Sequence, residues 1–175
     1  MCIRDSYLLM REAAEKGTLG KVFEIESRVT GSRGIPEGWR QYKVAGGGMM
    51  LDWGVHLIDQ MLMMIKSPVE SLYCEYSYIY GEEVDDGCSL TVNFENGMKY
   101  RIVVATDCFR NLPRWQVYGT EGTATVADWD LSGGITRVLV REDKELKGIK
   151  AGNGFTRTTV SYTHLRAHET LRHLV

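Results

Sequence analysis

The sequence predicts an α+β domain in which a mostly antiparallel open sheet carries its helices on one face. Its 175 residues suffice for one domain with a sizeable core. Hydrophobic residues make up 43% and charged residues 25%, which is typical of an ordinary soluble globular domain. The elements expected along the chain run helix, strand, helix and then a series of strands, and that order favours the α+β class.

Each element follows from a local pattern. The helices combine apolar residues at helical spacing with stop signals at Gly17 and at Ser67-Pro68. The strands alternate, and Asn96-Gly97 is a strong hairpin signal between two of them. The expected elements are a helix at 7–16, a strand at 21–30, a long glycine-rich loop at 31–48, a helix at 49–65, and strands at 69–80, 88–95, 98–106, 114–118, 123–129 and 135–141.

Two of these strands have a predicted sidedness. In the first, the alternation places Phe23, Ile25, Ser27 and Val29 on one face. In the strand at 69–80, Leu72, Tyr76, Tyr78 and Tyr80 share a face, with Tyr73 and Ile79 on the other. A sheet with helices on one side leaves its other side to be covered, so we expect a homo-oligomer that associates through the open sheet face.

Composition and charge exclude several classes of protein. A net charge of −2 offers no basic surface for nucleic acid, and no apolar run is long enough to cross a bilayer. The four cysteines (Cys2, Cys74, Cys88 and Cys108) form no CxxC pair and no disulfide framework. We therefore expect free thiols and a cytoplasmic location, with no structural metal.

The two ends of the chain resemble translated sequencing-adapter DNA. "MCIRDS" at residues 1–6 matches a transposase mosaic end, and "VSYTHLRAHET" at 160–170 matches its reverse complement. We expect 1–6 and 160–175 to be non-native tails that flank a native domain at 7–158, with Met1 not a true start. The HxxxH pair of His164 and His168 then carries no metal site.

The stretch "AGGGMMLDWGVHLIDQ" contains the candidate chemistry. His56 and Asp59 follow Asp52 by four and seven residues, so the three share one face of an otherwise apolar helix. Asp52 could orient the His56 imidazole for acid–base catalysis. Alternatively, His56 is a core histidine bonded to Asp52 in a non-catalytic oligomerisation module. A metal hydrolase would need more ligands than this stretch offers.

The segment "GGGMMLDWGVHLID" resembles the G-G-G-x-x-x-D-x-G-x-H-x-x-D signature in the C-terminal domain of the glucose–fructose oxidoreductase/inositol dehydrogenase (Gfo/Idh/MocA) family. "EKGTLGKVFEIESRV" and "WQVYGTEGTATV" are similar to flanking parts of the same domain. The resemblance covers residues 7–141. It implies a parent enzyme that transfers hydride between NAD or NADP and a sugar, polyol or inositol-like substrate, with the dinucleotide bound by a separate N-terminal domain.

The same resemblance implies roles for individual residues. His56 matches the catalytic histidine that accepts the substrate proton, and Asp52 matches the aspartate that binds substrate and orients it. Trp39, Arg40 and Lys43 lie where family members contact substrate, and a cation beside an aromatic ring suits hydroxyl or carboxylate groups. The phosphate-binding glycine loop and the E-K-P motif of the family are missing, so we expect this chain alone to bind no NAD(P) tightly and to show no turnover.

Overall fold

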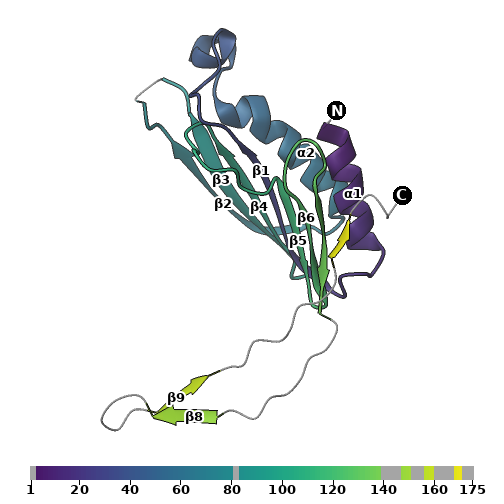
Figure 1. Cartoon of the computed structure of the whole chain (residues 1–175). Coiled ribbons are helices and arrows are strands. Elements are labelled where there is room, and N and C mark those ends of the chain that lie inside the picture. Colours follow the sequence, from purple (N-terminus) through teal and green to yellow (C-terminus); the bar gives the residue numbers. More distant parts are fainter. Residues whose placement is uncertain (1–2, 81–82, 139–146, 151–155, 160–167, 171–175) are drawn as a thin grey trace.

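The described residues of the computed structural model form one large open sheet with two helices on one side, and a separate two-stranded sheet (Figure 1). The structure describes residues 3–80, 83–138, 147–150, 156–159 and 168–170. In chain order the elements are α1 (Ile3–Glu15), β1 (Val22–Thr30), α2 (Val55–Met64), β2 (Val69–Ser77), β3 (Gly87–Phe94), β4 (Lys99–Ala105), β5 (Trp115–Gly119), β6 (Gly122–Val126), β7 (Gly133–Arg137), β8 (Lys147–Lys150), β9 (Thr156–Thr159) and β10 (His168–Thr170).

The sheet is mostly antiparallel, as the strand patterns predict. Among the described residues its order is β10-β7-β6-β5-β1-β4-β3-β2, and β8 pairs with β9 in a separate two-stranded sheet. In the larger sheet β1 and β4 run parallel, and the other described neighbours run antiparallel. The first strand is central because β4 pairs with one of its edges and β5 with the other. The predicted Asn96-Gly97 turn joins β3 to β4, with Gly97 at a φ of 81°.

The core lies between the sheet and the two helices. Helix α1 packs on β5 and β6, and α2 packs on β4. Alternate residues of the central strands face this layer, and the largest fully buried ones include Trp115 and Tyr100, whose rings meet edge to face with centroids 6.3 Å apart. The predicted α+β class with helices on one face is therefore confirmed (Figure 1).

The predicted sidedness of β1 is wrong at Phe23. Its register against β5 shifts between Val22 and Glu24, so Phe23 is the extra residue of a β-bulge. The side chain is 46% exposed and stacks on Tyr118, while Ile25 and Ser27 are buried as expected. The bulge therefore moves the Phe23 ring from the face of Ile25 and Ser27 to the open face.

The remaining open face of the central sheet is charged. Glu26 is buried, and its carboxylate accepts hydrogen bonds from the guanidinium of Arg28 and from the Tyr118 hydroxyl, the latter at 3.1 Å. Arg101 pairs with Glu24 at 2.8 Å and lies 3.5 Å from Glu26. The face opposite the helices is thus an ion-pair network with few apolar side chains.

The aromatic strand β2 is shorter than predicted, but its alternation is the predicted one. It ends at Ser77, so Tyr78 and Tyr80 lie beyond it. Leu72 and Tyr76 pair with Val92 and Cys88, both buried on the helix side. They are nevertheless 65% and 51% exposed because β2 is the edge strand. Leu72 and Tyr76 therefore share a face, as predicted, and that face is the helix side, whereas Tyr73 lies on the open side.

Several predictions concern the ends of the chain. Helix α1 begins at Ile3, four residues before the predicted helix, and Ser6 is buried. Residues 1–2, 160–167 and 171–175 of the predicted adapter tails, including His164, lie outside the described residues. The native boundaries at 7 and 158 therefore stay a prediction. Within the described part of the chain, no helix combines the length and apolar character that a membrane crossing needs.

Candidate functional site

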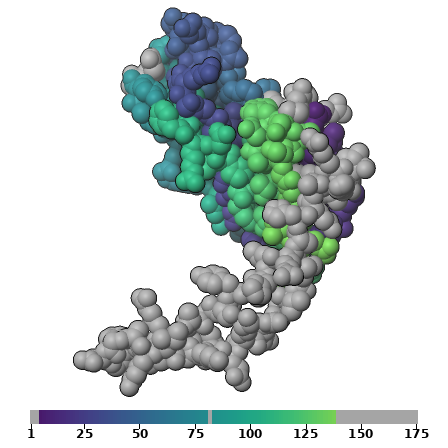
Figure 2. Space-filling view, in the orientation of Figure 1, coloured from purple at the N-terminus to yellow at the C-terminus, as the bar shows by residue number. Residues whose placement is uncertain are grey.

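The candidate site is built around the beginning of the second helix. The expected helix 49–65 starts with a π-helical turn, Met50–Gly54, and continues as α2 from Val55. The loop between β1 and this turn contains two short 3₁₀ turns, Trp39–Gln41 and Lys43–Ala45. This loop, blue in Figure 2, forms one projecting end of the molecule.

The three glycines allow that loop to lie directly against the helix start. The Gly47 N–H donates to the Tyr42 carbonyl and the Gly48 N–H to the Arg40 carbonyl, both at 2.9 Å. A side chain at Gly47 would collide with three backbone atoms, two of which lie at 2.7 and 2.8 Å from the position of its Cβ. Close backbone approach therefore requires glycine at this position.

Two adjacent buried aspartates, Asp85 and Asp86, attach the helix start to the beginning of β3. The Asp85 carboxylate accepts the Met50 N–H at 2.8 Å, and its backbone carbonyl accepts the Met49 N–H at 3.1 Å. A Cβ at Gly48, where φ is +108°, would collide with the same carboxylate. Asp85 thus satisfies N–H groups that a helix N-terminus otherwise leaves without an acceptor.

Asp86 makes the corresponding contacts with the end of β2. Its carboxylate accepts hydrogen bonds from the Ser77 hydroxyl at 2.6 Å, from the Ile79 N–H and from the Tyr80 N–H at 3.2 Å. The segment before β3 therefore bonds to the helix start on one side and to the edge strand on the other.

The structure brings Trp39, Arg40 and Asp52 together. Arg40 Nε donates to Asp52 Oδ2 at 2.7 Å, and the Arg40 guanidinium lies over the Trp39 ring at 4.8 Å from its centroid. The Asp52 side chain is only 12% exposed, so Arg40 compensates a largely buried charge. The partner of Asp52 is thus Arg40 from the preceding loop, and not His56 from its own helix.

His56 lies one turn further along and is exposed. Its ring meets Trp53 edge to face, with centroids 6.2 Å apart. Within the described part of the chain, no hydrogen bond joins its imidazole to the Asp52 carboxylate. The alternative in which His56 is a core histidine is wrong, since the ring is open to solvent. Asp59 is exposed as well.

Lys43 is the least integrated of the predicted site residues. It is exposed, and its backbone N–H donates to the Glu83 carboxylate at 2.8 Å. The side-chain contacts of the described residues therefore place Arg40 and Trp39, and not Lys43, beside Asp52.

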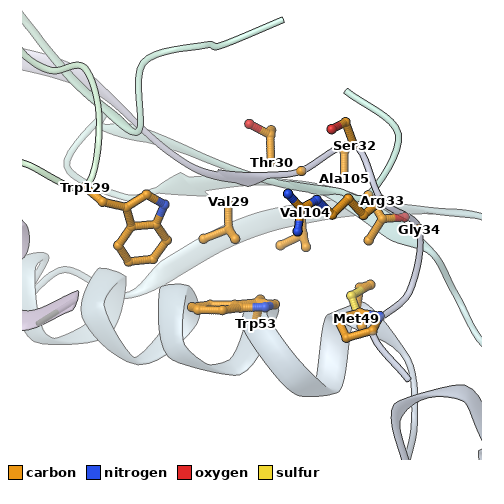
Figure 3. A pocket seen from close by; sticks show the side chains of 13 residues that line it. Val29, Thr30, Ser32, Arg33, Gly34, Met49, Trp53, Val104, Ala105 and Trp129 are labelled. Carbon is orange, nitrogen blue, oxygen red and sulfur yellow. The ribbon is translucent and has the colours of Figure 1, made fainter. Parts of the chain in front are cut away.

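A cavity of about 380 Å³ opens beside this helix start (Figure 3). Trp53 lies on its helix side and Val29 and Val104 on its sheet side, while Trp129 comes from the β6–β7 turn. The two indole rings are 5.8 Å apart. The sequence motif located Asp52 and His56 but not this cavity, because its walls come from segments distant in the chain. The one local signal of the cavity was Trp53, a large aromatic residue between Asp52 and Gly54.

Comparison with known proteins assigns the fold to a family. Residues 7–125 match the GFO/IDH/MocA C-terminal domain. The chain belongs to this family. The relatives compared below are described as oxidoreductases or NAD-binding proteins. In this chain the signature segment 46–59 carries Asp52 and His56.

Three relatives of this Gfo/Idh/MocA domain illustrate the match. An NAD-binding protein from Listeria innocua is 46% identical with a TM-score of 0.79, over 90% of this chain and 45% of that one. An uncharacterized oxidoreductase of Schizosaccharomyces pombe is 35% identical over 63 residues, or 35% of this chain and 17% of that one. The WlbA dehydrogenase from Bordetella pertussis, in complex with NADH and UDP-GlcNAcA, shares the fold at 24% identity and a TM-score of 0.56, over 70% of this chain and 38% of that one.

This chain spans less than half the length of these Gfo/Idh/MocA relatives. The glycine run in its motif offers no free N–H group to the pyrophosphate of a dinucleotide. The N–H groups of Gly46, Gly47 and Gly48, the only glycine run in the motif, all donate to carbonyls of the preceding loop. Backbone N–H groups that are already bonded cannot cradle a phosphate. Among the described residues, no three His, Cys, Asp or Glu side chains are grouped to bind a metal.

Proposed function

We propose that this domain supplies the substrate-binding and proton-transfer half of an NAD(P)-dependent oxidoreductase that acts on a sugar, polyol or inositol-like substrate. The observation that carries the proposal is an exposed imidazole, His56, one turn after the ion-paired Asp52 and in ring contact with Trp53, which lines a cavity. Small-molecule sites are typically apolar cavities with a few polar groups, and here His56 meets the cavity at its wall residue Trp53 without lining it.

The chemistry assigned to these residues is the proton half of alcohol oxidation. When a carbinol becomes a carbonyl, its C–H bond breaks with both electrons leaving as hydride, and its O–H proton must go to a base. His56 accepts that proton. NAD or NADP supplies the hydride-acceptor chemistry in such enzymes and would be bound by another part of the protein. Arg40 fixes Asp52 at the helix start, where its second carboxylate oxygen can accept a substrate hydroxyl.

Replacement of His56 by alanine in the full-length parent tests this role. We expect kcat to fall by about 10²–10⁴ with little change in Tm, because an exposed ring contributes little packing. Asp59→Asn is the matched control, since Asp59 is also exposed on the same helix. Unchanged turnover in the His56 variant would contradict the base role.

The cofactor half of the proposal has its own test. Purified chain titrated with NADH, followed by the nicotinamide fluorescence, should show no saturable binding in the micromolar range, because the glycine N–H groups are occupied. Saturable micromolar binding would show that the described residues do contribute a dinucleotide site.

We also propose that the domain self-associates through its open sheet face. Phe23 and Tyr73 are exposed aromatic residues on that side, at 46% and 63%, around the Glu26 ion-pair network. Light scattering on the purified chain should give a dimer or larger species, and Phe23→Lys with Tyr73→Lys should give a monomer. A monomeric wild-type chain would remove this proposal.

A further inference from the structure

The cavity beside Trp53 has the dimensions and lining of a ligand site. Its volume of about 380 Å³ falls within the range of roughly 300–1,000 Å³ that small-molecule sites occupy. It lies between the beginning of the second helix and the ends of β1 and β4, with Met49 and Trp53 facing Val29 and Val104 (Figure 3). The hydroxyl-bearing residues Thr30 and Ser32 also line it.

The aromatic walls favour a ring over an extended chain. An indole is flat and rigid, so it offers apolar area to the C–H face of a ring at little entropic cost. Trp129 is fixed from behind, because the Arg114 guanidinium lies 3.4 Å from the centroid of its ring. Arg114 is itself only 5% exposed, so its guanidinium is held within the domain. This support keeps the wall in place without a ligand.

Arg33 gives the cavity its charge. It lines this cavity and also the neighbouring hollow formed by Ser32, Gly34, Ile35, Gln41 and Tyr80. Within the described part of the chain Arg28, Arg40 and Arg101 each pair with a carboxylate, whereas Arg33 has no ion pair and is exposed. The residues that line the two hollows include no aspartate or glutamate. A guanidinium in this setting suits a carboxylate or phosphate, which it can bind with two parallel hydrogen bonds.

We propose that the cavity binds a cyclic sugar that carries an anionic group, with the ring against Trp53 and Trp129 and the anion on Arg33. This inference rests on the proposed function in that the bound ring is the substrate; His56 does not line the cavity but contacts its wall at Trp53. It narrows the substrate class from sugars and polyols in general to acidic or phosphorylated rings. In Figure 3 Trp129 and Arg33 lie toward opposite ends of the cavity, so ring and anion have separate contacts.

Calorimetric titration of the whole chain, with no cofactor present, tests the proposal. The probes are glucuronate and glucose 6-phosphate as anionic rings, glucose as the neutral ring, and glucarate as an open-chain anion. We expect one of the anionic rings to bind saturably, at least about tenfold more tightly than glucose and than glucarate, since a charge-assisted bond is worth about a factor of ten or more. Which of the two binds more tightly identifies the anion as carboxylate or phosphate.

Variants then assign the contacts. Arg33→Gln should reduce the affinity for the preferred anionic ring about tenfold and leave glucose unchanged, whereas Arg110→Gln, at an exposed arginine that does not line the cavity, should change neither. Trp53→Leu should weaken all cyclic probes, and near-ultraviolet circular dichroism would show that each variant is folded. Equal affinity for glucose and the anionic rings, no saturable binding, or an Arg33→Gln variant that binds like wild type would overturn the proposal.

The two proposals fail separately. Binding is measured without turnover. If the parent enzyme oxidises neutral sugars and this chain does not bind the anionic rings, the proposed function remains and this inference is removed. Conversely, binding of an anionic ring that His56→Ala in the parent still oxidises would retain the cavity assignment and remove the base role.

Discussion

Replacement of Gly47 by alanine should destabilise the domain through a backbone collision at the candidate site. The new Cβ would lie 2.7 Å from the Arg40 carbonyl carbon and 2.8 Å from the Tyr42 carbonyl oxygen, with the Arg40 oxygen closer still. Backbone atoms cannot rotate away as a side chain can, so the loop at 40–42 must shift. The shift would break two loop hydrogen bonds, from the Gly47 and Gly48 N–H groups. We expect a loss of about 2–3 kcal/mol in unfolding free energy.

Gly46→Ala is the matched control. Gly46 has a φ of +76° but its Cβ would meet no atom within 4 Å. Only the left-handed conformation then opposes alanine, which costs about 1 kcal/mol. Urea unfolding of the chain, followed by tryptophan fluorescence, gives both values. The reasoning fails if Gly47→Ala costs no more than Gly46→Ala, because the close approach would then not constrain the residue type.

Three further predictions concern the exposed helix face and the buried thiol. His56→Ala in the isolated chain should change the unfolding free energy by less than about 0.5 kcal/mol in urea titrations, since the ring is exposed; a larger loss would mean that the ring packs. Burial raises the pKa of the Cys88 thiol to about 12. Iodoacetamide at about pH 8 should therefore modify half-buried Cys108 before Cys88, as peptide mass spectrometry would show, and equal labelling would contradict the burial. Because the folded state binds the Cys88 thiol proton more tightly, this contribution to stability is complete below about pH 9 and is lost as the pH rises toward 12, with a slope of up to about 1.4 kcal/mol per pH unit. Urea midpoints measured across this pH range should therefore fall less steeply in Cys88→Ala than in wild type. An unchanged slope would assign the pH dependence to other groups such as Tyr100, whose pKa burial also raises.

Local patterns predicted the parts of the fold that depend on neighbours in sequence. Alternation located the strands, and Asn96-Gly97 located the turn between β3 and β4, because a tight hairpin is determined by two residues and their flanks. The family resemblance, and no local pattern, singled out Trp39 and Arg40, and in the structure the Arg40 guanidinium lies over the Trp39 ring.

What the sequence did not reveal depends on partners far along the chain. The bulge that exposes Phe23 is a property of the register between β1 and β5, and neither strand encodes it alone. The exposure of Leu72 and Tyr76 follows from the place of β2 at the sheet edge. The cavity likewise needs Trp53 and Trp129 to meet across separate elements, so helical periodicity could not indicate it.

The two adjacent aspartates before β3 have a consequence for how the domain opens. Asp85 bonds to the Met50 N–H at the helix start, and Asp86 bonds to the Ile79 and Tyr80 N–H groups beyond the edge strand. Edge strands are the parts of a sheet that open most readily, and neighbouring groups tend to open as one cooperative unit. Opening at the edge of the sheet should therefore also loosen the helix start that carries the site. Hydrogen exchange would show this as similar rates of deuterium uptake at the Met50 and Tyr80 amides.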